Sequence, residues 1–332
     1  MPTFLSLSAP PPQDPGRGAK KVPAPSAMAP NAPKAPSAAG APDGAPVEAA
    51  GPWAALWGRG DVRDAVREAR DALAHLRFHE GLRRGWPEAR AEAAVRDAAA
   101  LARLEGVSIS ADDVRDLSLR DAAGEGAGPR GAVIGPGTGG TRGADPGRAL
   151  ALGIWRAQWR LADGFAPLNT RQPAARTSPP LPAVVSGIHR DVCSALLASG
   201  LVAPSSVALP TDPARLRRAL AAAASPAPAI LAAAAVLAQF RGAEVFTPGS
   251  LAVGGILARW LLVERGVDPT GVAVLSLADA EDPAGAGSAL GAWMRGDEDG
   301  AAAWVARVAR GLVRGAQEGE DVALHVQAGR LR

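Results

Sequence analysis

Apolar residues recur every three or four positions along most of this chain, which is the spacing of a buried helix face. The first stripe predicts a helix over residues 61–84, and its members are Val62, Val66, Ala69, Leu73 and Leu76. A second predicted helix starts near Pro87 and ends before Gly106, because proline favours the first helical turn and glycine the position after the last. Ser110 and Asp113 have the spacing of a capping box and predict the start of a short third helix.

The same pattern continues through the second half of the chain. Asp145 and Pro146 predict a helix start, and Gly164 predicts its end. The further predicted helices cover residues 183–199, 213–224, 227–241, 252–265, 283–294 and 301–328. Three of them have a predicted aspartate cap: Asp212, Asp282 and Asp299.

Strand-like pieces are confined to Val107–Ile109 and Gly271–Leu277, and they do not alternate with helices in β-α-β order. Alanine dominates the apolar residues, tyrosine is absent and aromatic residues make up 4% of the chain. Such a composition favours helices, because alanine is the best helix former and adds little bulk to a sheet. The predicted fold is an all-α helical bundle with at most a short β-hairpin.

The N-terminal segment differs from the rest of the chain. Residues 1–52 hold thirteen of the thirty prolines and few large apolar side chains, so we expect a disordered Pro/Ala-rich tail. Residues 53–120 are predicted to be helical, and residues 121–147 to form a glycine-rich flexible loop. Residues 148–332 are predicted to complete one domain with residues 53–120.

Composition and charge exclude several classes of protein. The net charge is +3 and the longest basic run is Arg215–Arg218, so we expect no nucleic-acid binding. The first residues lack a signal-peptide pattern, and the most apolar segment, Ala227–Phe240, is too short to span a membrane. Cys193 is the single cysteine and is expected to be a buried thiol in a reducing compartment. We therefore expect a soluble cytoplasmic protein, and the Ala, Gly, Arg and Pro content is typical of a GC-rich bacterial genome.

One glycine pattern suggests a dinucleotide-binding site. Gly135, Gly137 and Gly140 have the G-x-G-x-x-G spacing that lets a backbone approach a pyrophosphate. A nucleotide-dependent oxidoreductase is therefore one alternative. However, this motif requires a strand before the glycines and a helix beginning at the third one. Here the next helix cannot begin before Asp145, and Pro136 removes one backbone N–H, so we favour a flexible loop.

A second segment, "QFRGAEVFTPGSLAVGGILARWLLVERGVDP", joins two apolar helices by a short turn. It resembles the central motif of the Fic family (filamentation induced by cAMP), H-P-F-x-[D/E]-G-N-G-R-x-x-R, with Phe246 at the motif phenylalanine and Gly249 at its first glycine. "LARLEG" resembles the inhibitory segment of the family and retains Glu105 and Gly106. The resemblance covers about residues 60–330 and implies a helical fold.

Members of this family transfer AMP from ATP, bound with Mg²⁺, to a protein hydroxyl group. This chain departs from the motif at every reactive position. Glu244 replaces the histidine that acts as base, Pro248 replaces the metal-binding acid, and Ser250 replaces the asparagine. The other replacements are Leu251 for the second glycine and Ala252 and Gly255 for the two arginines. Phosphoryl chemistry depends on charge neutralisation, so these losses should abolish the family's reaction.

We therefore predict a non-catalytic binding or regulatory module with an unknown protein partner. The principal alternative is an AMP transferase with altered chemistry that uses Glu244, Ser250 and Arg259. In that case Gly249, Ser250 and Arg259 would contact ATP, since Arg259 lies one helical turn beyond Gly255. Because Gly255 cannot pair with Glu105, we expect Glu105 to form a local cap or hydrogen bond instead.

Other candidate residues point to structural roles. His75 and His79 have the spacing of two metal ligands on one helix, with Glu80 beside them, but no third ligand is evident and we predict no metal site. His189 is far in sequence from any carboxylate cluster. The tryptophans on predicted helices are expected to fill space left by small alanines in the core, and they are Trp155, Trp159, Trp260, Trp293 and Trp304.

Overall fold

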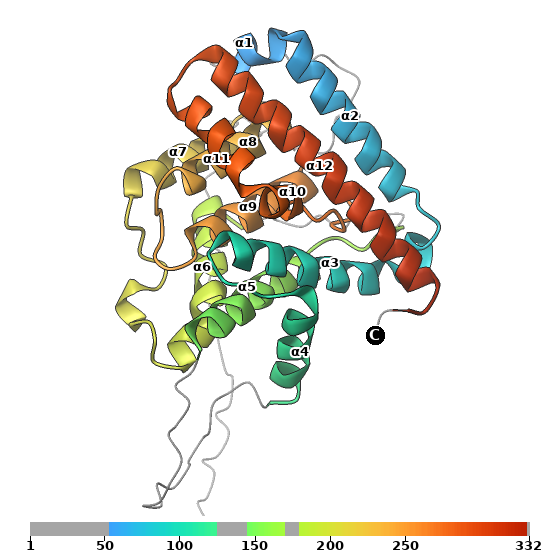
Figure 1. The fold of residues 1–332 in the computed structure, drawn as a ribbon, viewed down its shortest axis with the longest axis vertical. Coiled ribbons are helices and arrows are strands. Elements are labelled where there is room, and N and C mark those ends of the chain that lie inside the picture. The colour runs from blue at the N-terminus through green and yellow to red at the C-terminus, as the bar shows by residue number, and fades with distance from the viewer. Residues whose placement is uncertain (1–52, 125–144, 170–178, 331–332) are drawn as a thin grey trace, which may run out of the picture. The chain divides into compact units, whose positions relative to one another are not determined.

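The computed structural model describes residues 53–124, 145–169 and 179–330, and these residues fold into helices without a β-strand (Figure 1). The helices are α1 (Trp53–Gly58), α2 (Gly60–Arg77), α3 (Leu82–Leu104), α4 (Ala111–Ala122), α5 (Pro146–Asp163), α6 (Leu181–Ala198), the 3-10 helix η1 (Pro204–Ser206), α7 (Pro213–Ala224), α8 (Ala229–Arg241), α9 (Ser250–Glu264), α10 (Leu277–Glu281), α11 (Pro283–Met294) and α12 (Glu298–Gln327). The predicted all-α fold is confirmed. The predicted tail over 1–52 lies outside the described residues, as do the glycines Gly135, Gly137 and Gly140 in the predicted loop over 121–147.

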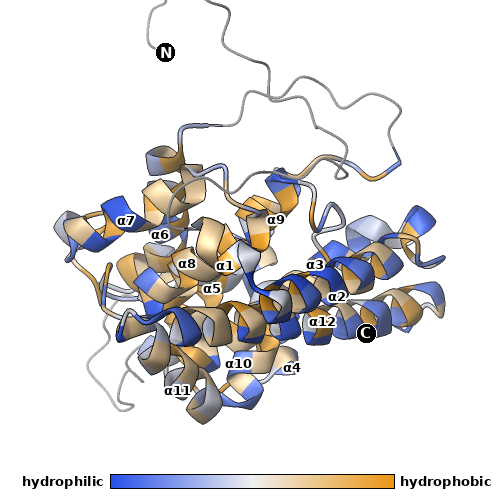
Figure 2. Ribbon diagram, turned by 90° about the horizontal axis from the view of Figure 1, so that it is seen from above, coloured by the Kyte–Doolittle hydropathy of each residue, from blue (hydrophilic) through white to orange (hydrophobic). Residues whose placement is uncertain are grey.

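The core is centred on two apolar helices. Nearly every residue of α8 is buried, and α9 is buried along most of its length. Figure 2 shows α8 as largely hydrophobic, whereas α2 and α12 carry many hydrophilic residues. The long helices α2 and α12 lie side by side (Figures 1 and 2) and cover one side of the core with their apolar faces.

Helix starts follow the predicted caps with one exception. Ser110 and Asp113 form the capping box at the start of α4, and Asp145, Asp212 and Asp282 cap the helices that follow them. The cap predicted at Asp299 is wrong. The N-cap of α12 is Asp297, and Asp299 pairs with Arg59 at 2.7 Å.

The helix predicted over 61–84 is interrupted. α2 ends at Arg77 and α3 begins at Leu82, with Gly81 between them. A Cβ on Gly81 would lie 2.3 Å from the carbonyl oxygen of Ala323, so the chain turns where it meets α12. Gly85 has non-helical backbone angles, and regular helix resumes around Pro87, as the proline indicates.

The two strand-like pieces form no strand. Residues 271–274 are irregular, and the N–H of Val274 donates to the carbonyl of Gly315 on α12 at 3.1 Å. The tryptophans divide into two groups. Trp304 is fully buried and its indole N–H donates to the carbonyl of Ala234 at 2.7 Å, but Trp159 is 44% exposed. The prediction that Trp159 fills the core is therefore wrong.

Among the described helices, α6 alone has the length and apolar composition of a membrane span. Half of its residues are buried against the rest of the protein.

Candidate functional site

The turn between α8 and α9 contains the residues with the most specific sequence pattern. Gly249 is the N-cap of α9 and has a φ of 91°, in the left-handed region that favours glycine. A Cβ on Gly249 would lie 2.6 Å from Cγ1 of Val192, so both its backbone angle and its surroundings require glycine. The Thr247–Pro248 peptide bond that precedes it is cis.

Ser250 holds this turn together from inside. Its hydroxyl accepts a hydrogen bond from the N–H of Val245 at 3.0 Å and donates to the carbonyl of Phe240 at 3.1 Å. The residue is buried, at 6% exposure. The Ser250 hydroxyl is therefore engaged within the protein and does not face a ligand.

His189 on α6 is the second residue that shapes the turn. It is fully buried and its ring stacks on Phe246 at a centroid distance of 4.4 Å. Nδ1 accepts from the N–H of Ala208 at 2.8 Å, so Nε2 carries the proton and donates to the carbonyl of Pro248 at 3.1 Å. Burial lowers the pKa of His189, which keeps the ring neutral. Nε2 also lies 3.2 Å from Sγ of Cys193, one turn further along α6. Sequence reasoning missed the role of His189 in the turn because the partners at Ala208 and Pro248 are backbone groups.

Glu105 lies at the N-terminus of α9. Its Oε1 accepts a hydrogen bond from the N–H of Ala252 at 2.8 Å, and the backbone of Leu251 also bonds to this carboxyl. Gly106 follows with a φ of 84° and leads the chain away from α3. Free N–H groups and the helix dipole make such a helix end a binding site for anions. The protein's own carboxylate occupies that position.

Glu244 adds a second carboxylate to the region. Its side chain is exposed and accepts from the hydroxyl of Thr247 at 3.3 Å. Burial raises the pKa of Glu105, and the charge of Glu244 raises it further. The two carboxylates are therefore close enough to repel each other, and a phosphate placed between them would add further negative charge.

The positions that correspond to the two arginines of the sequence motif are both buried, and Gly255 lies against α3. Ala252 is completely buried, and a Cβ on Gly255 would lie 2.6 Å from Cδ2 of Leu101. Leu101 is itself completely buried and has little freedom to move. A long cationic side chain therefore has no room at Gly255 without displacement of α3.

Arg259 belongs to a buried polar network. It is 2% exposed, and its guanidinium donates to Oε1 of Gln158 and, at 2.6 Å, to the carbonyl of Gly271. Gln158 in turn donates to Asp97, which also accepts from the N–H of Ser276 at 2.8 Å. Burial lowers the pKa of Arg259 and raises the pKa of Asp97. The guanidinium links α9 to the segment around Gly271, and its hydrogen bonds are to Gln158 and Gly271, not to residues of the turn.

The residues of the turn do not fit a magnesium-bound nucleotide. Pro248 offers no carboxylate for a metal ion, and the hydroxyl of Ser250 is used internally. The N–H of Ala252 is taken by Glu105. Phosphate binding would require cations or free N–H donors, and the described part of the turn directs carboxylates at this position instead.

The two histidines with metal-ligand spacing do not converge on one point. Nδ1 of His75 lies 2.7 Å from Oε1 of Glu320, whereas Nδ1 of His79 accepts from the N–H of Gly81 at 3.1 Å. The described residues contain no group of three His, Cys, Asp or Glu side chains that could hold a metal ion. Cys193 is buried, and burial raises the pKa of its thiol to about 11, so the thiol stays protonated at neutral pH.

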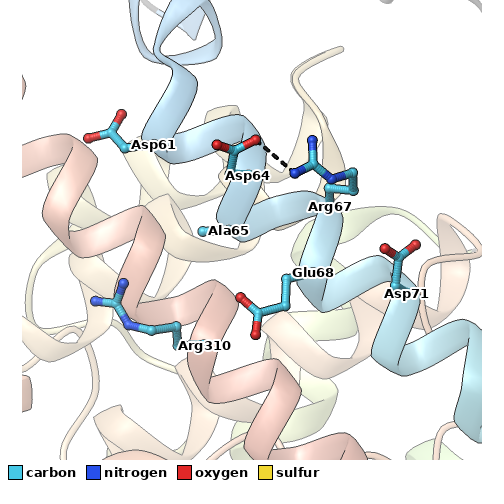
Figure 3. A pocket seen from close by; sticks show the side chains of 7 residues that line it. All are labelled: Asp61, Asp64, Ala65, Arg67, Glu68, Asp71 and Arg310. Carbon is cyan, nitrogen blue, oxygen red and sulfur yellow. Dashed lines mark ion pairs between the residues drawn. The ribbon is translucent and has the colours of Figure 1, made fainter.

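A depression of about 510 Å³ lies between α2 and α12 (Figure 3). The carboxylates around it come from one side of α2: Asp61, Asp64, Glu68 and Asp71. Asp61 and Asp64 pair with neighbouring arginines at 2.9 Å, and Arg310 of α12 lies on the opposite side. These groups form a hydrated charged surface, and no buried polar group points into it.

No model of a known protein family matches the chain, and no curated protein is similar to it.

Proposed function

We propose that this protein is a Fic-like helical module that acts by binding a partner protein and does not transfer nucleotides. The observation that carries this proposal is the 2.8 Å hydrogen bond from the Ala252 N–H to the carboxylate of Glu105. A phosphate at the start of α9 would have to displace that carboxylate. The order of an apolar helix, a turn with Gly249 and a second apolar helix supports the Fic-like part of the proposal.

The charges around the turn support the absence of transfer chemistry. Nucleotidyl transfer needs positive groups around the phosphates and a metal ion that bridges them. Glu105 and Glu244 are both carboxylates, and Arg259 is bonded within the core. Removal of even one charge-stabilising donor commonly lowers an enzyme's rate by about a hundredfold or more.

A module without this chemistry would act through its surface. We propose that its partner is a protein and that its setting is a bacterial cytoplasm, where the turn before α9 keeps a structural role. The bonds of His189 and Ser250 support such a role, because they hold the turn in one conformation from inside the core.

Incubation with ATP labelled at the α-phosphate, in the presence of Mg²⁺, tests this proposal. The full chain should show no more incorporated label than its Glu244→Gln variant, because Glu244 occupies the position of the base. A matched control is Glu68→Gln, which removes an exposed carboxylate from α2. Label that is present in the wild type, retained in Glu68→Gln and lost in Glu244→Gln would overturn the proposal in favour of an altered AMP transferase.

A further inference from the structure

A second surface feature lies where α3, α4 and α5 meet. It is a groove of about 290 Å³, and Trp155 and Trp159 of α5 line it. The groove is separate from the turn before α9. Glu88 lies on α3 and lines the groove, and Glu105 directly follows the last residue of α3. The separation of seventeen residues between these two positions corresponds to roughly 25 Å along a helix.

The two tryptophans form an aromatic surface. They lie four residues apart on α5, and their rings stack with a centroid distance of 6.2 Å and an interplanar angle of 21°. Trp155 is half-buried, and Trp159 is 44% exposed. Indole rings are large apolar groups that proteins usually cover, and they are enriched at the centres of binding interfaces. An exposed pair in a groove therefore indicates a contact surface.

Most charges in the groove are already balanced. Glu92 accepts from Nε of Arg96 at 2.9 Å and from Arg115 at 2.8 Å, and Arg115 also bonds to Asp112. Glu88 is different, since no hydrogen bond or ion pair to its carboxylate occurs within the described part of the chain. The groove thus presents one uncompensated negative charge beside two indole rings.

A carboxylate next to an aromatic face selects an organic cation. A guanidinium group can contact the aromatic face and the carboxylate at the same time, because it stacks flat on an indole ring and donates paired N–H groups to a carboxylate. The volume of the groove suits one side chain. Leu119 of α4 is 63% exposed and directly follows Ser118, which lines the groove. The occupant therefore extends past a single cation.

We propose that this groove binds an arginine side chain from a basic segment of a partner protein. The guanidinium stacks on Trp155 and Trp159 and donates to Glu88, and an apolar neighbour in the same segment contacts Leu119. The association is non-covalent and independent of the turn before α9.

The test is a titration of the full chain, labelled with 5-fluorotryptophan, followed by ¹⁹F NMR. Trp155→Phe and Trp159→Phe assign the two signals of interest. The probe is a capped tetrapeptide with one arginine and one leucine, compared with peptides that carry lysine or citrulline in place of arginine. Both signals should shift in a saturable manner with the arginine peptide, several-fold more weakly with lysine, and not with citrulline.

Two variants with matched controls test the contacts. Glu88→Gln should weaken binding by about fivefold, whereas Glu68→Gln on α2 should leave it unchanged. Ala91→Leu, which adds bulk to the half-buried floor of the groove, should abolish binding, and Ala74→Leu on an exposed part of α2 should not.

Three results would overturn the proposal. The first is the absence of any shift of the two assigned signals with the arginine peptide. The second is equal binding of the arginine and citrulline peptides, or an equal effect of Glu88→Gln and Glu68→Gln. The third is binding of free arginine amide as tightly as the peptide, which would assign the groove to a small molecule. Because Glu88 is exposed, its variant keeps the fold and the test remains decisive.

Discussion

The carboxylate of Glu105 lies 2.8 Å from the backbone nitrogen of Ala252, across 147 residues of sequence. This contact joins the end of α3 to the first turn of α9. The carboxyl group satisfies N–H groups that the helix leaves unpaired. The helix dipole favours its negative charge, but burial outweighs this effect and raises the pKa of Glu105. The same geometry would hold a phosphate, so one side chain both stabilises the helix and closes the position to anions.

The first prediction concerns the pH dependence of this contact. Burial raises the pKa of Glu105 above its ordinary value of 4.5, so the folded protein binds this proton more tightly than the unfolded chain. Stability from this group is therefore fully present below about pH 4.5 and is lost as the pH rises through the folded pKa. Glutamine keeps an acceptor oxygen but does not titrate. In urea denaturation, the free energy of unfolding of Glu105→Gln should exceed that of the wild type. This difference should grow from about pH 4 to about pH 7.

An exposed carboxylate provides the control for this measurement. Glu68→Gln should differ from the wild type by a small amount that changes little with pH. A constant difference between Glu105→Gln and the wild type over the same range would mean that Glu105 is not buried at α9.

The second prediction concerns His189. Burial lowers its pKa below the ordinary value of 6.5, so the unfolded chain binds the proton more tightly and stability falls as the pH drops below about 6.5. His189→Phe keeps an aromatic ring against Phe246 but leaves the Ala208 N–H and the Pro248 carbonyl unpaired. We expect a loss of about 2 kcal/mol near neutral pH. The loss should become smaller towards about pH 5, because the phenylalanine variant lacks the histidine titration.

Denaturant unfolding of the wild type and His189→Phe at both pH values checks this prediction. Equal stability of the two proteins at neutral pH would show that the two backbone hydrogen bonds contribute nothing.

The third prediction compares two glycines inside helices. A Cβ on Gly255 of α9 would lie 2.6 Å from the fully buried Leu101, whereas nothing lies within 4 Å of a Cβ on Gly187 of α6. Gly187→Ala should stabilise the protein by about 0.5–1 kcal/mol through helix propensity. Gly255→Ala should destabilise it by about 1–3 kcal/mol through overpacking. Thermal unfolding of both variants and the wild type checks this prediction. A change of stability in the same direction for Gly187→Ala and Gly255→Ala would contradict it.

The fourth prediction concerns the buried network around Arg259. Arg259→Leu leaves Gln158 and Asp97 buried without their cation, and loss of one partner in a buried polar pair costs about 3–5 kcal/mol. Asp97→Asn removes the compensating negative charge. The double variant should therefore lose less stability than the sum of the two single losses. Strictly additive losses in urea denaturation would show that the two groups are not coupled.

Helix positions were largely predictable because their signals are local. The capping box of Ser110 and Asp113, the aspartates before the prolines and Gly164 each act within one turn of a helix. The acidic run before α12 offers several possible caps, and the choice of Asp297 depends on tertiary contacts. A Cβ on Gly300 would lie 2.3 Å from the carbonyl oxygen of Ala292, which constrains where this helix meets α11.

The candidate site was less predictable because its contacts are distant in sequence. The expected local cap or hydrogen bond of Glu105 is wrong. Its carboxylate accepts from the N–H of Ala252, 147 residues away, and that contact depends on how the end of α3 packs against α9. His189 gave no signal of its role in the turn, because the contacts that join it to residues 208 and 248 are made to backbone groups. Spacing on a helix placed Arg259 near Gly255, but it could not show that the guanidinium is bonded in the core.

The central claim is that the turn before α9 does not bind nucleotides. Its most direct test is isothermal titration calorimetry of the full chain with ATP, ADP and AMP, each with and without Mg²⁺. We predict no saturable heat for any nucleotide, because the carboxylate of Glu105 occupies the N-terminus of α9 and the guanidinium of Arg259 is bonded within the core. Saturable binding of ATP that requires Mg²⁺ and is weakened by Gly249→Ala, but not by Gly187→Ala, would contradict the account.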